Sequence, residues 1–216
     1  MKNHNLENFY WIGGCPSSGK TTLAAEISKQ SGIGVYHTDD HIMKYAPRFI
    51  PKQPKFHESV HMNFVESMVT MPNNEWFDMF IAGMREFCSI ILSDVKELFI
   101  AEKMIVEGGY LLPEFVSDIG CKNRAVFING SYEYLREYLP KQKWVVEMVT
   151  NIESYERKAL FIERFVYKYN LFREYVIKSA EKLGMKTVFT NAPNSLEDNV
   201  KITMQHIMSV QYKHVI

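Results

Sequence analysis

A short phosphate-binding motif constrains this chain more than any other feature of its 216 residues. From Gly14 to Thr21 the sequence reads GCPSSGKT, which matches the pattern G-x-x-x-x-G-K-[ST] at every fixed position. The apolar residues 9–12 precede the motif as a candidate buried strand, and residues 21–30 follow it with the spacing of a helix. A loop between a strand and a helix directs backbone N–H groups at one point, where phosphate binds. The sequence therefore predicts a nucleotide-binding loop.

Each position in this loop has an expected part in binding ATP, or GTP, together with Mg²⁺. Glycines permit unusual backbone dihedral angles and a close approach of the phosphates. Lys20, which we expect to be a surface residue with no core role, reaches the β- and γ-phosphates and takes part in catalysis, and the Thr21 hydroxyl binds Mg²⁺. The predicted nucleotide-binding residues are Gly14, Cys15, Pro16, Ser17, Ser18, Gly19, Lys20, Thr21 and Thr22.

Short β-rich runs alternate with helical patterns along the rest of the chain. The runs cover residues 9–12, 34–36, 104–106, 124–128 and 187–189, with helices expected between them. Prolines at positions 47, 51 and 54 predict a loop, and residues 57–70 and 76–99 have helical spacing. This alternation is typical of a parallel sheet with right-handed crossovers, on which ligands bind at the carboxyl ends of the strands. We expect one α/β domain over residues 1–216, with a helical insert near residues 47–99.

Carboxylates follow two of these strands. Asp39 and Asp40 come after the second strand, where an acid can orient or deprotonate an acceptor hydroxyl and can bind Mg²⁺ through its waters. Glu107 follows the third strand and can hold a water of the Mg²⁺ shell. A turn role for the aspartates and a surface position for the glutamate are the alternatives. We expect His37 and His41 to be solvated loop residues rather than metal ligands.

Basic residues concentrate between the fourth and fifth strands, where we expect a lid near residues 131–175. Lid arginines stabilise the transferred phosphate and exclude water. Arg157 and Arg164 lie seven positions apart, on one face of a helix, and are the best candidates, Arg157 for nucleotide binding and Arg164 for catalysis. Because glutamates are interspersed in the same stretch, a solvated helical face is the alternative.

Composition limits the partners of the chain. The 25 basic and 25 acidic residues cancel, which disfavours nucleic acid as the main partner. Three cysteines without a CxxC pair suit a reducing cytoplasm, and the absence of any run of 18 apolar residues predicts no membrane-spanning helix. A helix N-terminus can lower the pKa of the Cys15 thiol and make it sensitive to oxidation, although a role in filling the loop is the favoured interpretation.

Three segments together resemble a known group of enzymes. GGCPSSGKTT, HTDDH and VEGGYLLPE are similar to the small P-loop kinases of the nucleoside kinase-like group, such as uridine and nicotinamide riboside kinases, and to uncharacterised bacterial P-loop ATPase-like kinases. The resemblance implies a three-layer α/β P-loop NTPase fold with a five-stranded parallel sheet in the order 2-3-1-4-5 and a helical lid. It also implies that Asp39 is the catalytic base and contacts Mg²⁺, that Glu107 is a Mg²⁺-shell ligand, and that Asp40 is the less favoured base.

The function expected from these features is transfer of the γ-phosphoryl group of ATP to a hydroxyl of a small molecule. A nucleotide-binding regulatory module with little turnover is one alternative. A nucleotide monophosphate kinase is disfavoured, because residues 107–111 lack the arginine with which such enzymes contact the acceptor phosphate. Residues 190–193 should lie near the adenine. The sequence leaves the acceptor, the choice between ATP and GTP, and the oligomeric state open.

Overall fold

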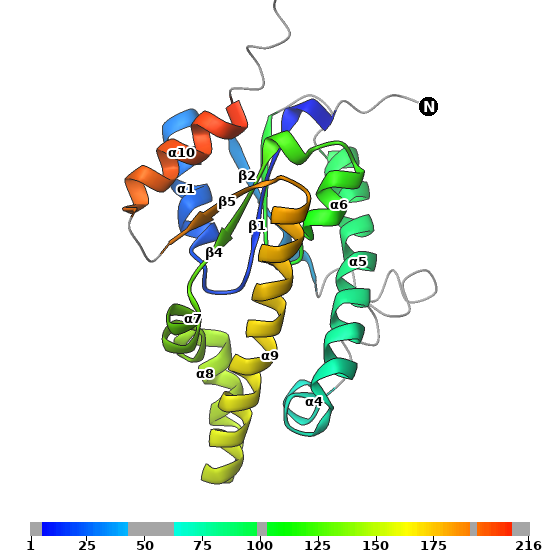
Figure 1. Cartoon of the computed structure of the whole chain (residues 1–216), viewed down its shortest axis with the longest axis vertical. Coiled ribbons are helices and arrows are strands. Elements are labelled where there is room, and N and C mark those ends of the chain that lie inside the picture. Colours follow the sequence, from blue (N-terminus) through cyan, green and yellow to red (C-terminus); the bar gives the residue numbers. More distant parts are fainter. Residues whose placement is uncertain (1–5, 43–62, 99–102, 191–193, 209–216) are drawn as a thin grey trace, which may run out of the picture.

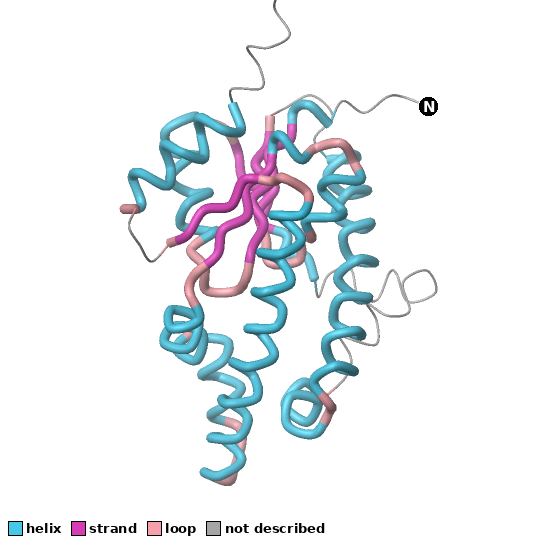
Figure 2. Tube along the Cα trace, viewed as in Figure 1, coloured by secondary structure: helices cyan, strands magenta, loops and turns pink. Residues whose placement is uncertain are grey.

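Five short strands form a parallel sheet at the centre of the molecule (Figures 1 and 2). The computed structural model describes residues 6–42, 63–98, 103–190 and 194–208. The strands are β1 (Phe9–Gly14), β2 (Gly34–His37), β3 (Met104–Glu107), β4 (Ala125–Asn129) and β5 (Lys186–Phe189). Their order in the sheet is β2-β3-β1-β4-β5, and every pair of neighbours is parallel. This confirms the expected fold class and strand order.

Helices connect the strands, and capping groups mark several of their ends. They are α1 (Lys20–Ser31), α4 (Phe64–Thr70), α5 (Asn73–Leu98), α6 (Pro113–Asp118), α7 (Tyr132–Tyr138), α8 (Lys143–Thr150), α9 (Tyr155–Lys182) and α10 (Leu196–Met208). Gly32 ends α1 in the left-handed conformation, with φ of 73°. Before α10, the Ser195 hydroxyl accepts a hydrogen bond from the Asp198 amide, and Asp198 accepts one from the Ser195 amide.

The expected helical stretch between the fourth and fifth strands is divided in the structure. Short 3-10 turns, η1 (Leu6–Asn8), η2 (Thr38–His41), η3 (Lys122–Arg124) and η4 (Leu139–Lys141), supplement the helices. Pro140 lies in η4, where its missing N–H is compatible with the break between α7 and α8. The prolines at positions 47, 51 and 54, and the part of the expected helix before residue 63, lie outside the described residues.

Helices cover both faces of the sheet, because side chains alternate along its strands. Phe9 and Trp11 of β1 face the core formed with α5, α6 and α9, whereas Tyr10 and Ile12 face the core formed with α1 and α10. All six residues of β1 are buried, as expected for a central strand of a parallel sheet covered on both faces. The result is the three-layer arrangement visible in Figure 1.

A third core lies beyond the carboxyl edge of the sheet and contains no strand residue. α4, α7, α8 and the N-terminal half of α9 extend from that edge in Figure 1. The buried members of this helical core are Met68, Trp76, Leu135, Leu139, Val145, Ile152, Phe161, Phe165 and Tyr169. No helix within the described ranges is both long and apolar enough to span a membrane.

Candidate functional site

The phosphate loop leaves β1 and enters α1 through backbone conformations that suit glycine. Gly14 has a φ of 133°, and a Cβ atom there would lie 1.9 Å from the carbonyl oxygen of Ile128 on β4. Ser17 and Gly19 also have positive φ angles, of 61° and 81°. Left-handed residues within such a turn allow successive N–H groups to face one concavity, which is the basis of phosphate binding by these loops. Ser17 is the one non-glycine residue with a positive φ angle in the described chain.

Three polar atoms around this loop have no hydrogen-bond partner within the described chain. They are the buried hydroxyls of Ser17 and Ser18 and Nδ2 of Asn129 at the end of β4. Unpaired buried polar atoms are costly, so a group that supplies partners is favoured there. Phosphate oxygens accept hydrogen bonds from hydroxyl and amide groups, and the residues present therefore fit a nucleotide. Sequence reasoning missed Asn129, whose side chain meets Cys15 across 114 positions of the chain.

Lys20 is more enclosed than expected. It is the first residue of α1, only 7% of its surface is exposed, and its Nζ donates a 2.7 Å hydrogen bond to the carbonyl oxygen of Cys15. The expectation of a surface residue is therefore wrong, because the side chain folds back across its own loop. Lys20 still lines the cavity described below, together with Ser17 and Thr21.

Cys15 is an inert part of the loop. Its Sγ donates to Oδ1 of Asn129 at 3.1 Å, and 1% of the residue is exposed. Burial raises the pKa of the Cys15 thiol to about 11, although the positive charges of Lys20 and Arg173 oppose this. Desolvation thus outweighs the nearby cations, and the thiol is protonated at neutral pH. The loop-filling interpretation of Cys15 agrees with this, whereas a lowered pKa does not.

Two of the three predicted magnesium residues, Thr21 and Glu107, meet at the carboxyl edge of the sheet, whereas Asp39 bonds to Thr38 and Gly109. Glu107 ends β3 and pairs in register with Ile12 of β1 and with His37 of β2. The Thr21 hydroxyl lies 3.3 and 3.4 Å from the two Glu107 carboxylate oxygens, and Glu107 is only 3% exposed. A hydroxyl beside a buried carboxylate is an arrangement of oxygen ligands that suits Mg²⁺ with nucleotide phosphates.

His37 is a member of this site that the sequence interpretation missed. Its Nδ1 lies 2.8 Å from Oε2 of Glu107, and the residue ends β2 rather than lying in a loop, although 34% of its side chain is exposed. The two residues are 70 positions apart but end adjacent strands, so their side chains leave the sheet side by side. That shared position at the carboxyl edge is the signal that could have identified His37.

Asp39 faces the phosphate loop from the other side. Its Oδ1 accepts hydrogen bonds from the Thr38 hydroxyl at 3.1 Å and from the Gly109 amide at 3.3 Å. A Cβ atom on Gly108 would lie 1.6 Å from the Thr38 hydroxyl, so this glycine permits the close approach of the two loops. Asp39 lines the same cavity as Lys20 and Thr21, and Asp40 is not among the residues that line it.

One cavity of about 430 Å³ lies between the phosphate loop and Asp39, and we call it the loop cavity. Ser17, Lys20, Thr21 and Asp39 line its polar end. Its other end is aromatic and is lined by Phe64, Phe80, Tyr110, Trp144, Tyr169 and Phe172. The polar end belongs to the sheet edge and the aromatic end to the helices beyond it. Such a volume is in the range of small-molecule sites.

A smaller cavity, of about 180 Å³, is lined by Gly19 of the phosphate loop. Thr22, Tyr134, Thr190 and Asn199 are among its lining residues. Within the described chain the Thr190 hydroxyl and Oδ1 of Asn199 are buried without a hydrogen-bond partner. Thr190 belongs to the segment expected near the adenine, of which residues 191–193 lie outside the described residues.

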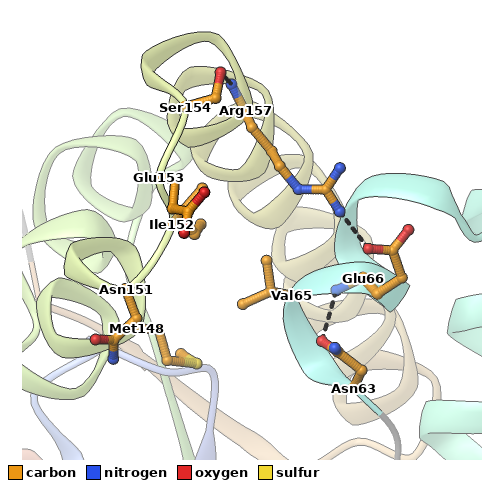
Figure 3. Close-up of a pocket in the computed structure, with 9 residues that line it drawn as sticks. All are labelled: Asn63, Val65, Glu66, Met148, Asn151, Ile152, Glu153, Ser154 and Arg157. Carbon is orange, nitrogen blue, oxygen red and sulfur yellow. Dashed lines mark hydrogen bonds and ion pairs between the residues drawn. The ribbon is translucent and has the colours of Figure 1, made fainter.

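The two arginines selected from the sequence lie elsewhere. Arg157 forms an ion pair with Glu66 across a separate cavity of about 450 Å³ between α4 and the α8–α9 turn (Figure 3). Arg164 is exposed on α9, and neither arginine is among the residues lining the loop cavity. Their roles stay predictions. Arg173, by contrast, donates from Nη1 to the carbonyl oxygen of Gly130, directly after β4, at 3.3 Å.

Comparison with known proteins finds solved structures that are similar at low sequence identity. No protein-family model and no curated protein matches the sequence. Shikimate kinase from Acinetobacter baumannii in complex with shikimate is 13% identical, with a TM-score of 0.48 and 95% of each chain covered. Shikimate kinase from Bacteroides thetaiotaomicron is 11% identical, with a TM-score of 0.49, and the match covers 94% of this chain and 97% of that one.

An uncharacterized protein from Eubacterium ventriosum is also similar, at 13% identity and a TM-score of 0.48, with 93% of this chain and 98% of that chain covered. Structural similarity at this level of sequence identity does not identify a substrate for this chain. The all-parallel strand order, together with the motif between β1 and α1, gives the chain the three-layer α/β fold of P-loop proteins.

Proposed function

We propose that this protein transfers the γ-phosphoryl group of ATP to a hydroxyl group of a small molecule. The observation that carries the proposal is the loop cavity, in which Lys20 and Thr21 of the phosphate loop share one space with Asp39. That space continues between aromatic side chains, which gives room for an acceptor beside the position of the γ-phosphate. A site that only sensed nucleotide would need no such second compartment.

The nucleotide would lie across Gly19, between the two cavities. Its adenine would occupy the smaller cavity, where Thr190 and Asn199 offer polar atoms to the ring and Tyr134 offers an aromatic surface. Its phosphates would follow the loop from Gly19 to Cys15, at the N-terminus of α1. Thr21 and Glu107 would hold Mg²⁺, which neutralises charge on the phosphates.

Asp39 would act on the acceptor. The acceptor oxygen forms a bond to the γ-phosphorus, the bond from that phosphorus to the bridging oxygen of ADP breaks, and Asp39 takes the hydroxyl proton. Lys20 would stabilise the negative charge of the group in transfer, since its bond to the Cys15 carbonyl uses one of the three N–H donors of the ammonium group. Arg173 is a further cation close to the loop, since its charge acts on the Cys15 thiol.

A regulatory module with little turnover is the second candidate. It is favoured by the hydrogen bonds that Asp39 makes with Thr38 and Gly109, because a turn residue would make the same contacts. A nucleotide monophosphate acceptor has weaker support, as Lys20 is the one basic side chain among the described residues that line the loop cavity.

A panel of hydroxyl-bearing metabolites with γ-phosphate-labelled ATP tests the proposal. We expect the label to appear in an organic product, and Asp40→Asn to retain this transfer better than Asp39→Asn. Release of labelled inorganic phosphate alone, with every acceptor in the panel, would favour the regulatory module instead.

A further inference from the structure

We propose that the acceptor is an uncharged alcohol carried on a planar aromatic ring, which is bound between the aromatic side chains of the loop cavity. This inference rests on the proposed function, because it names the class of molecule that the aromatic end of that cavity would accept. It predicts that such an alcohol binds more tightly than acceptors that carry a carboxylate or phosphate, and more tightly than compact polyols.

The charges around the cavity support an uncharged acceptor. Among the described residues that line it, the basic and acidic side chains are Lys20 and Asp39, and both belong to the polar end. A carboxylate placed at the aromatic end would lose its hydration without gaining a cationic partner from the described lining residues, which is unfavourable. The buried Lys168 is committed elsewhere, because its Nζ donates to the carbonyl oxygens of Ser67, Met68 and Met71 at 2.9 to 3.1 Å.

The rings at the aromatic end are held in place before any ligand binds. Phe80 packs against Trp76, with ring centroids 4.6 Å apart, and edge-on against Phe172 at 5.4 Å. Trp144 of α8 packs edge-on against Phe165 at 5.5 Å. Rings fixed in this way bind a flat ligand by stacking or edge contacts with little loss of side-chain entropy.

Two phenol groups give this end a limited polar character. Burial raises the pKa of Tyr110 and of Tyr169, and the negative charge of Asp39 contributes to both shifts. Both phenols are therefore neutral and can donate hydrogen bonds, and both lie near enough to Asp39 to sense its charge. A ring with one or two polar substituents would be matched better than a highly hydroxylated molecule, whose many groups would lack partners.

Three matched alcohols separate the possibilities: phenylethanol, phenyllactate, which adds a carboxylate, and cyclohexylethanol, which lacks the planar ring. Calorimetric titration without nucleotide measures binding, and label transfer from ATP measures reaction. We expect the affinity for phenylethanol to be at least about tenfold higher than the affinity for phenyllactate. We expect it to bind about 3- to 10-fold more tightly than cyclohexylethanol, the usual range for an aromatic contact. Equal or reversed affinities would overturn the inference, as would failure of all three to bind.

Two variants locate the binding. Trp144 is 40% exposed, so Trp144→Ala should leave the fold intact and weaken phenylethanol about 3- to 10-fold, with the affinity for an ATP analogue unchanged. Gln142 lines the same end and is partly exposed, so Gln142→Arg should tighten phenyllactate by supplying a cation. If neither variant alters these affinities, the ring binds outside the loop cavity and the inference is wrong.

The two measurements keep the inference and the proposed function apart. Binding in the expected order without label transfer to any alcohol would support the ligand class and contradict the kinase. Transfer to phenyllactate or to a polyol, in preference to phenylethanol, would support the kinase and overturn the ligand class.

Discussion

At the carboxyl edge of the sheet the backbone places the functional groups, whereas in the helices beyond that edge side-chain packing places them. Thr21, His37 and Glu107 meet because a loop and two strands end at the same edge, with the strands in register. The aromatic end of the loop cavity draws instead on residues from α4, α5, α8 and α9, which are held together by the helical core. The first region is recognisable from a short motif, and the second depends on contacts between distant segments.

This difference assigns separate tasks to the two halves of the loop cavity. The sheet edge provides groups suited to phosphate and metal, which any nucleotide-dependent transfer needs. The helical part provides the acceptor surface, which can vary without disturbing the phosphate loop. Changes in one region should therefore affect one task and spare the other, and the experiments below test that separation in order of expected effect.

The largest effect is expected at Asp39. Asp39→Asn preserves the size of the side chain and leaves one oxygen to accept the hydrogen bonds from Thr38 and Gly109, but it removes the base. We expect kcat for phosphoryl transfer to fall by roughly 10²–10⁴, the usual contribution of general base catalysis, with ATP affinity little changed. Steady-state kinetics with an identified acceptor measures this. Asp40→Asn is the matched control, and a greater loss in that variant would assign the base to Asp40.

Cys15 tests how rigid the phosphate loop is. A shift of the thiol pKa from 9.0 to about 11 lowers the thiolate fraction at neutral pH about 100-fold. We expect the rate at which iodoacetamide modifies Cys15 to be at least about 100-fold lower in the native protein than in the unfolded chain. Mass spectrometry follows the modification. Fast modification that ATP prevents would mean that the loop opens, and would restore the idea of a redox-sensitive site.

Lys168 tests the helical region. The side chain is fully buried, and its three hydrogen bonds satisfy carbonyl groups at the end of α4, whose Phe64 lines the loop cavity. We expect Lys168→Met to lower the free energy of unfolding by about 2–3 kcal/mol, because carbonyl groups lose charged donors. Lys178→Met, at an exposed position on the same helix, should change it by less than about 0.5 kcal/mol. Urea denaturation measures both, and equal effects would contradict the account of α4.

The same lysine gives a pH dependence. Burial, with a smaller contribution from Arg164, lowers the pKa of Lys168 from 10.5 to about 8 in the folded protein. Between these two values the unfolded chain binds more protons than the folded protein, so this lysine makes stability rise as pH increases from about 8 to 10.5. Urea denaturation across that range should show a smaller rise in Lys168→Met than in the wild type. Identical pH profiles would contradict the lowered pKa.

The smallest effect is expected at His37. His37→Asn should loosen the orientation of the Glu107 carboxylate and raise the Mg²⁺ concentration needed for half-maximal activity about tenfold, as for other partners of metal ligands. His41→Asn, at the next histidine, should alter this requirement less. A Mg²⁺ titration of activity distinguishes the two, and an unchanged requirement in His37→Asn would limit the histidine to a structural role.

The sequence predicted the regions that local patterns encode. The loop from Gly14 to Thr21, the parallel strand order and the places of Asp39 and Glu107 at strand ends all follow from short segments or from the resemblance they carry. Residues that act through long-range contacts were missed or left unplaced. Cys15 meets Asn129 across 114 positions, and Lys168 meets Ser67 across 101.

The arginines illustrate the same limit. Helical spacing related Arg157 to Arg164, but the periodicity of a helix does not say which of its turns faces the phosphate loop. In the structure the N-terminal end of α9 points away from the sheet (Figure 1), and Arg157 pairs there with Glu66 of α4. Arg173, more than four turns further along the helix at about 3.6 residues per turn, reaches the carbonyl oxygen of Gly130, directly after β4, instead.

Titration with a non-hydrolysable ATP analogue in the presence of Mg²⁺ tests the central claim most directly, namely that the loop from Gly14 to Thr21 binds nucleotide phosphate. The wild-type protein should release or take up measurable heat with one site per chain, and Lys20→Ala should show no measurable binding. Circular dichroism of the variant should be unchanged, since the lost hydrogen bond to Cys15 lies within the loop. Equal affinity in the wild type and in a folded Lys20→Ala variant, or no binding to the wild type at all, would contradict the account.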